Sequence, residues 1–127
     1  MTGTELLNAA LDIIGLRDHD GSLPEDTADL SQRALGLINI LLAENAILNA
    51  RIERSDIEPI CIRTLGETIA ISPLLSESVL PYGLAMLFML GEDNTLAKSY
   101  ESLYTSARIS ALKAGKSIPH AITEVYK

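Results

Sequence analysis

Apolar residues recur every three or four positions along most of this chain, which is the period of one face of an α-helix. The first such stretch covers residues 4–16, where Gly15 stands at a place where helices often end. A longer stretch covers residues 25–50, and a helix of that length would measure roughly 35–40 Å. Residues 95–114 repeat the pattern, and Gly115 follows their predicted end.

The period changes to two in the middle of the chain, as in strands that bury one face. Residues 60–65 and 68–72 alternate in this way, and Gly66-Glu67 between them suits a type II′ turn. We therefore predict a small β-hairpin between the second and third helices. Cys61, in the first of these segments, is expected to be a small buried side chain.

The third predicted helix contains an apolar run without a visible polar face, Val79-Leu-Pro-Tyr-Gly-Leu-Ala-Met-Leu-Phe-Met-Leu90. Ser76 or Ser78 can cap this helix. It is either the central helix of the domain or a helix that a neighbouring subunit helps to cover. Either way, subunit or core packing is assigned to Leu80, Tyr82, Leu84, Leu87 and Phe88.

Together these patterns predict a mainly α fold, a four-helix domain with a β-hairpin inserted between its second and third helices. A chain of 127 residues fits one domain. We place the helical domain at residues 1–115 and a flexible C-terminal arm at residues 116–127, which contain Pro119.

The charge narrows the classes of partner. Ten basic and seventeen acidic residues give a net charge of −7. Nucleic-acid binding is driven by clustered Lys and Arg, so the excess of carboxylates argues against it, and also against an anionic membrane surface. The apolar run 79–90 is too short for the roughly 20 residues of a membrane span. We expect a soluble protein made in a cytoplasm.

Candidate chemistry is sparse, and we predict neither an enzyme nor a cofactor or metal site. His19 and His120 have no second ligand at zinc spacing. The acidic residues of the first connection lack the ligand positions of an EF-hand and fit a solvated loop; they are Asp18, Asp20, Glu25, Asp26 and Asp29. Cys61 has no activating neighbour in the sequence. Arg51, Arg54 and Arg63 fit either a helix C-terminus with complementary charges or a patch for an acidic partner.

Several motifs of the chain occur in the same order in a known family. They are Leu80-Pro-Tyr-Gly-Leu-Ala85, Gly91-Glu-Asp and Ala97-x-x-Tyr100-x-x-x-Tyr104, after an opening Leu6-Leu-Asn-Ala-Ala-Leu-Asp-Ile-Ile-Gly15 and a second-helix Leu37-Ile-Asn-Ile-Leu-Leu42. From about residue 5 to 112, the chain resembles the head–tail connector proteins of tailed bacteriophages, also called adaptor or head-completion proteins. These are packing motifs rather than catalytic ones.

The resemblance implies a structural virion protein that assembles as a ring, joins the portal of a phage head to the tail and extends the DNA channel. It would be found in the virion, and in the cytoplasm of the bacterial host during assembly. Its partners would be the portal protein, a tail-joining protein and further copies of itself. Docking on the portal is then expected from arm residues Ile118, Ile122, Val125 and Tyr126. The alternative is a small cytoplasmic helical regulatory or adaptor protein that binds a partner protein.

Overall fold

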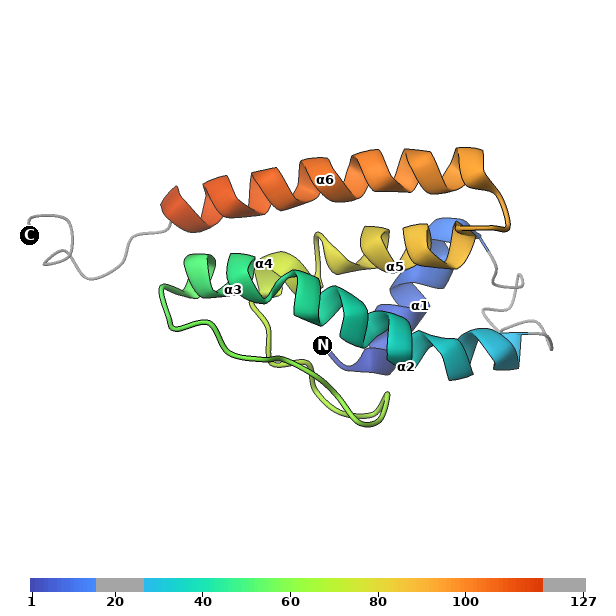
Figure 1. Cartoon of the computed structure of the whole chain (residues 1–127), viewed down its shortest axis with the longest axis horizontal. Coiled ribbons are helices and arrows are strands. Elements are labelled where there is room, and N and C mark those ends of the chain that lie inside the picture. Colours follow the sequence, from blue (N-terminus) through green and yellow to red (C-terminus); the bar gives the residue numbers. More distant parts are fainter. Residues whose placement is uncertain (16–26, 118–127) are drawn as a thin grey trace, which may run out of the picture.

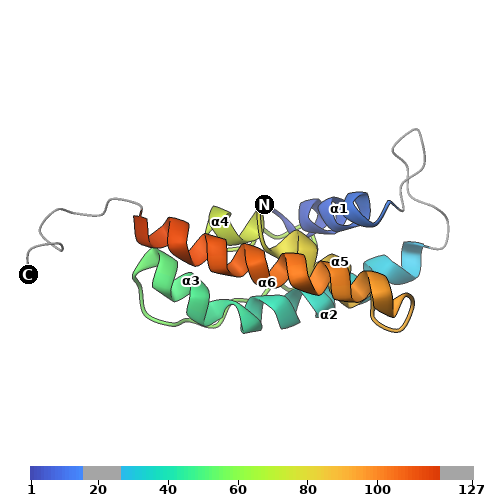
Figure 2. The same ribbon diagram turned by 90° about the horizontal axis from the view of Figure 1, so that it is seen from above.

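The computed structural model describes residues 1–15 and 27–117, and these form a helical domain (Figure 1). Seen from above, α6 runs along the molecule, with α1 and α4 on one side and α2 and α3 on the other (Figure 2). The mainly helical character is as predicted. The helical segments are α1 Gly3–Ile14, α2 Thr27–Glu44, α3 Ala46–Glu53, the single turn α4 Pro73–Ser76, α5 Leu80–Met89 and α6 Asn94–Ser117.

Helix α5 is the centre of this domain. It contacts α1, α2 and α6, which cover it from three sides (Figure 1). Pro81 lies in its first turn, where a missing N–H costs no helical hydrogen bond. Gly83 brings α5 close to two neighbours, since a Cβ there would lie 2.8 Å from Leu41 Cδ2 and 2.9 Å from Tyr104 Cε1. The apolar run therefore needs no polar face over most of its length, because α1, α2 and α6 cover it, while Leu90 at its end is exposed.

The predicted β-hairpin is wrong, because the described residues contain no strand. Residues 55–72 form an extended loop, with one isolated bridge between Thr2 and Thr68. The two predicted strands do not pair with each other. The Asn39 side chain takes the place of a partner strand: its Nδ2 donates to Ile62 O and its Oδ1 accepts from Ile62 N, both at 2.9 Å.

The start of the chain holds the second half of this loop. Ile69 N donates to Met1 O at 2.8 Å, and Thr4 N donates to Leu65 O at 2.8 Å. The alternation still decides which side chains turn inward, since Ile62 and Ile69 are buried. A period of two therefore identifies the buried side chains. The backbone groups of the loop, however, make their hydrogen bonds with the Asn39 side chain and with the first residues of the chain.

The predicted long second helix is divided at Asn45. The axes of α2 and α3 differ by 53° there, with Asn45 as the residue between them. Its side chain is fully buried and donates from Nδ2 to Leu41 O at 2.8 Å. A buried amide requires partners, and the bend lets Asn45 meet those offered by α6.

The last helix is longer than predicted and continues past Gly115 to Ser117. Gly115 does not end α6 but allows it to approach α3, because a Cβ there would lie 3.0 Å from Ile52 Cγ1. Residues 116–117, assigned to the arm, are thus helical. The arm residues Ile118, Ile122, Val125 and Tyr126 lie outside the described residues, as do both histidines.

Candidate functional site

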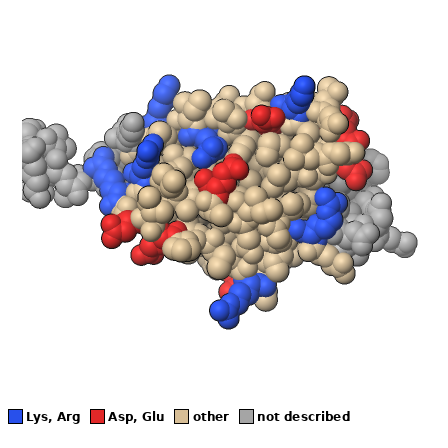
Figure 3. All heavy atoms as spheres, viewed as in Figure 1, with Lys and Arg blue, Asp and Glu red and all other residues tan. Residues whose placement is uncertain are grey.

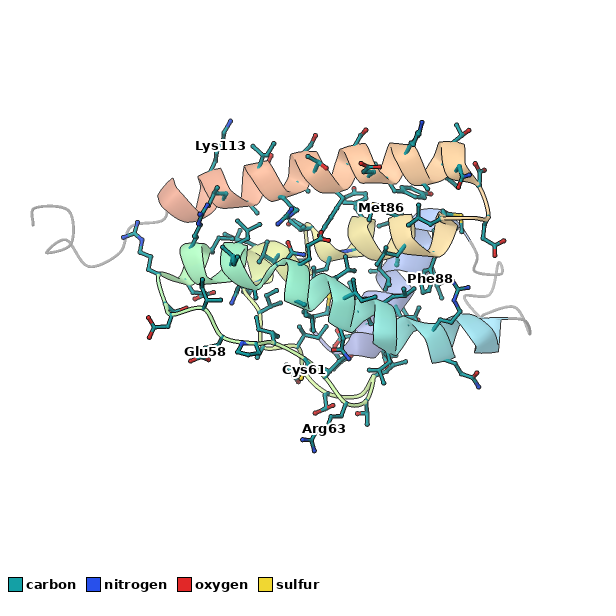
Figure 4. All side chains as sticks on the ribbon, viewed as in Figure 1. Glu58, Cys61, Arg63, Met86, Phe88 and Lys113 are labelled. Atoms are coloured by element: carbon teal, nitrogen blue, oxygen red, sulfur yellow. The ribbon has the colours of Figure 1, made fainter. Side chains whose placement is uncertain are left out.

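The residues predicted for subunit or core packing lie in the core of the domain. Leu80, Leu84 and Phe88 have no exposed surface, and Phe88 points inward from α5 (Figure 4). Tyr82 and Leu87 are half-buried and pack against the same core. In this structure the three fully buried side chains hold the subunit together and offer nothing to a neighbour. Leu90, at the end of the run, is the exception, since it is 54% exposed.

A groove between α3 and α6 exposes apolar side chains of both helices. Its volume is about 340 Å³. Ile47 on α3 and Ile109 on α6 are 53% and 52% exposed, although isoleucine is usually a core residue. We call this surface the α3–α6 groove; its lining residues are Ile47, Leu48, Arg51, Thr105, Arg108, Ile109 and Leu112.

A partly buried polar network fixes one wall of the groove. Arg108 Nε donates to Asn45 Oδ1 at 3.0 Å, and Asn45 Nδ2 donates to Tyr104 Oη at 2.8 Å. Tyr104 Oη in turn donates to a carboxylate oxygen of Glu44. The Arg108 guanidinium also lies over the Tyr104 ring, 5.6 Å from its centroid. The network joins the α2–α3 bend to α6 and sets the position of Arg108 in the groove.

Tyr104 is held as a neutral phenol in this network. Burial of the phenol raises its pKa above the usual value of about 10, and the hydrogen bond to the Glu44 carboxylate raises it further. Its hydroxyl therefore remains a donor to Glu44 at neutral pH. The residue is a structural support of the groove, since it is 4% exposed.

Charge is distributed unevenly along the molecule. Figure 3 shows Lys and Arg side chains over the end formed by α3 and the last turns of α6, where Arg51, Arg54, Arg108 and Lys113 lie. Acidic side chains stand at the opposite end, at the turn between α5 and α6, which carries Glu92 and Asp93, and basic side chains, Lys98 among them, lie on the same half of the molecule. Glu53 is also exposed near the basic end. The residues that line the groove include two arginines and no carboxylate, and the carboxylate of Glu44 accepts from Tyr104 in the adjoining network.

Two further sequence-based expectations are corrected. Cys61 is exposed, because it alternates with the buried Ile62 and points out of the loop (Figure 4). Arg63 does not join Arg51 and Arg54: it lies on the loop, on the side of the molecule away from α6, beside Glu67 (Figure 4). Two arginines remain at the end of α3, and Arg108 of α6, which the sequence did not single out, is the basic residue that faces the groove with Arg51.

The described residues provide no metal site, since no three His, Cys, Asp or Glu side chains lie together among them. Within the same residues, no single helix is long and apolar enough to cross a membrane. Only α2 and α3 taken together meet that criterion, and they are bent by 53°.

Comparison of the chain with protein-family models, with curated proteins and with solved structures gave no match. The features of the chain that bear on its function are therefore its sequence motifs and the geometry of the groove.

Proposed function

We propose that this protein is a structural assembly protein, the head–tail connector of a bacteriophage or prophage. The observation that carries the proposal is the α3–α6 groove. Two isoleucines that are each about half exposed flank it, and two guanidinium groups lie beside them. Contiguous exposed apolar surface next to polar groups is typical of a site that binds protein. The groove thus fits a docking role.

Two motifs of the resemblance also meet in space. Gly83, from Leu80-Pro-Tyr-Gly-Leu-Ala85, lies against the ring of Tyr104, the last residue of Ala97-x-x-Tyr100-x-x-x-Tyr104. The spacing between these motifs therefore has a packing reason, which is the close approach of α5 to α6. A net charge of −7 would further suit a ring around DNA that has to slide without sticking.

The test is binding to a portal protein. The portal encoded in the same gene cluster is produced together with this protein, and complexes are isolated by size and viewed by electron microscopy. A ring of several copies on the portal is expected. A groove variant, Ile109→Asp, should weaken that complex while the fold is retained, because Ile109 is exposed. A stable complex of one copy with an unrelated partner, without portal binding, would instead fit a small regulatory protein and contradict the proposal.

A further inference from the structure

The turn between α5 and α6 has the properties that the groove requires of a ligand. Leu90 is 54% exposed, and the next residues carry two carboxylates, Glu92 and Asp93. Lys98 is the one basic side chain among the residues that line the hollow of about 320 Å³ beside Leu90, and Glu101 lines it too. The turn thus combines an exposed leucine with negative charge, whereas the groove combines exposed isoleucines with positive charge.

The turn is also well ordered by its own hydrogen bonds. Leu90 N donates to Met86 O at 3.1 Å, and Asp93 N donates to Met89 O at 3.0 Å. Gly91 adopts a positive φ of 86° and donates to Asn94 Oδ1 at 3.1 Å. A turn that is fixed before binding loses little conformational freedom when it docks. We call these four residues, Leu90, Gly91, Glu92 and Asp93, the Leu90 turn.

We infer that the α3–α6 groove receives the Leu90 turn of a second copy of this chain, with Leu90 between Ile47 and Ile109 and Glu92 beside Arg51. This inference rests on the proposed function and names the contact by which the copies associate. The turn and the groove of one chain cannot meet. Asn94 and Ile109 are fifteen residues apart on the straight part of α6, which corresponds to roughly 22 Å.

The contact is proposed to be head-to-tail rather than two-fold. A two-fold dimer in which each groove receives the turn of the other copy could not grow beyond two chains, so the dependence of mass on concentration distinguishes the two arrangements. A two-fold contact of groove with groove would bring the arginines of both copies together, and like charges at short range repel. A head-to-tail contact leaves one free groove and one free turn at the ends, so that further copies add until a ring closes or a filament grows.

Two variants isolate the contact. Leu90→Asp removes the apolar side chain of the turn and leaves the groove intact; Ile109→Asp blocks the groove and leaves the turn intact. Both positions are about half exposed, so circular dichroism should show an unchanged helical fold. We expect the mass of the wild type in sedimentation equilibrium to rise with concentration beyond a dimer. Each variant alone stays monomeric, and a mixture of the two gives dimers and nothing larger.

Charge reversal supplies a second test in which Leu90 and Ile109 are unchanged. At low salt, Arg51→Glu and Glu92→Arg should each weaken association about tenfold, because each turns an attraction into a repulsion. The double variant that carries both substitutions restores opposite charges across the contact, and its association should return to within about twofold of the wild type. Arg33→Glu, an exposed reversal on α2, serves as the control for net charge and should change little.

Three results would overturn the inference: a wild type that remains monomeric up to about 1 mM, a dimer that does not grow, or a mixture of variants that does not dimerise. The millimolar limit corresponds to the weakest association that the assay detects. Portal binding is measured separately. A protein that binds the portal but shows no head-to-tail contact retains the proposed function, whereas one that self-associates but ignores the portal loses it.

Discussion

Removal of the Asn45 side chain should destabilise the fold, because that residue holds the α2–α3 bend against α6. Asn45→Ala deletes three hydrogen bonds: two that Nδ2 donates, to Leu41 O and Tyr104 Oη, and one that Oδ1 accepts from Arg108 Nε. All three involve a side chain with no exposed surface.

The expected fall in the free energy of unfolding depends on which partners of Asn45 keep another hydrogen bond after the substitution. Leu41 O still accepts the helical N–H of Asn45, and Tyr104 Oη still donates to Glu44. Arg108 Nε loses the partner that Asn45 gave it. Taking about 1 kcal/mol for each hydrogen bond, we expect the free energy of unfolding to fall by about 2–3 kcal/mol. For a chain of this size that is a drop in Tm of roughly 8–12 °C.

Urea unfolding followed by far-UV circular dichroism measures this change. Gln32→Ala is the matched control, since it removes an exposed amide from α2 and should alter the free energy of unfolding by less than about 0.5 kcal/mol. If Asn45→Ala cost no more than Gln32→Ala, the network would contribute nothing to stability, and another cause of the bend would be needed.

Three further changes test other parts of the structure. Gly83→Ala should destabilise the fold by about 1 kcal/mol, because its Cβ would strike the buried Tyr104 ring. Gly36→Ala, which has open space around it on α2, should stabilise the fold by about 0.5–1 kcal/mol. Thermal unfolding compares the two variants. The pKa of Tyr104 is raised on folding, so its contribution to the free energy of unfolding is complete below pH 10 and falls as the pH rises further. The wild type should therefore lose stability above pH 10 more steeply than Tyr104→Phe, which urea titrations at several pH values measure. The pKa of Glu67 is lowered, first by the N–H of Thr64 that donates to its carboxylate, so this loop contact should persist above pH 4.5 and weaken as the pH falls further. Glu67→Ala removes the same contact at neutral pH, and hydrogen exchange at the Thr64 amide should then become faster. Unchanged exchange would contradict the prediction.

The helical periodicity predicts most of the fold because the helices packed around α5 each bury one face. It placed α1, α5 and α6 near their observed positions. It missed the α2–α3 bend, since Asn45 falls on the apolar stripe and the pattern does not say which neighbour will pair with a buried amide. The signal was present: a polar residue on a buried stripe requires a partner.

The predicted hairpin is wrong for a related reason. Alternation reports which side chains are buried, and Ile62 and Ile69 are buried as it requires. It does not report where backbone groups find hydrogen bonds, and here Asn39 and the first residues of the chain supply them. Cys61 was consequently expected inside, although its place next to Ile62 turns it outward.

The groove could not be predicted from the sequence. Ile47 and Ile109 are far apart in the chain, and each fits the apolar pattern of a helix whose face is covered. Their exposure follows from how α3 lies beside α6, which depends on the bend and on the close contact of Gly115 with Ile52. The sequence pattern indicates residues 79–90 instead, and in the structure most of these side chains pack in or against the core while Leu90 is exposed.

The most direct test is whether the α3–α6 groove is the surface through which copies of this chain assemble on the portal. A large maleimide label is attached in one sample to native Cys61, which is exposed on the loop, and in another to Ile109→Cys in a Cys61→Ser background. Binding of each labelled protein to the portal complex is then measured. The account predicts that the label at position 109 abolishes binding and that the label at Cys61 leaves it intact. Equal binding by both would contradict it.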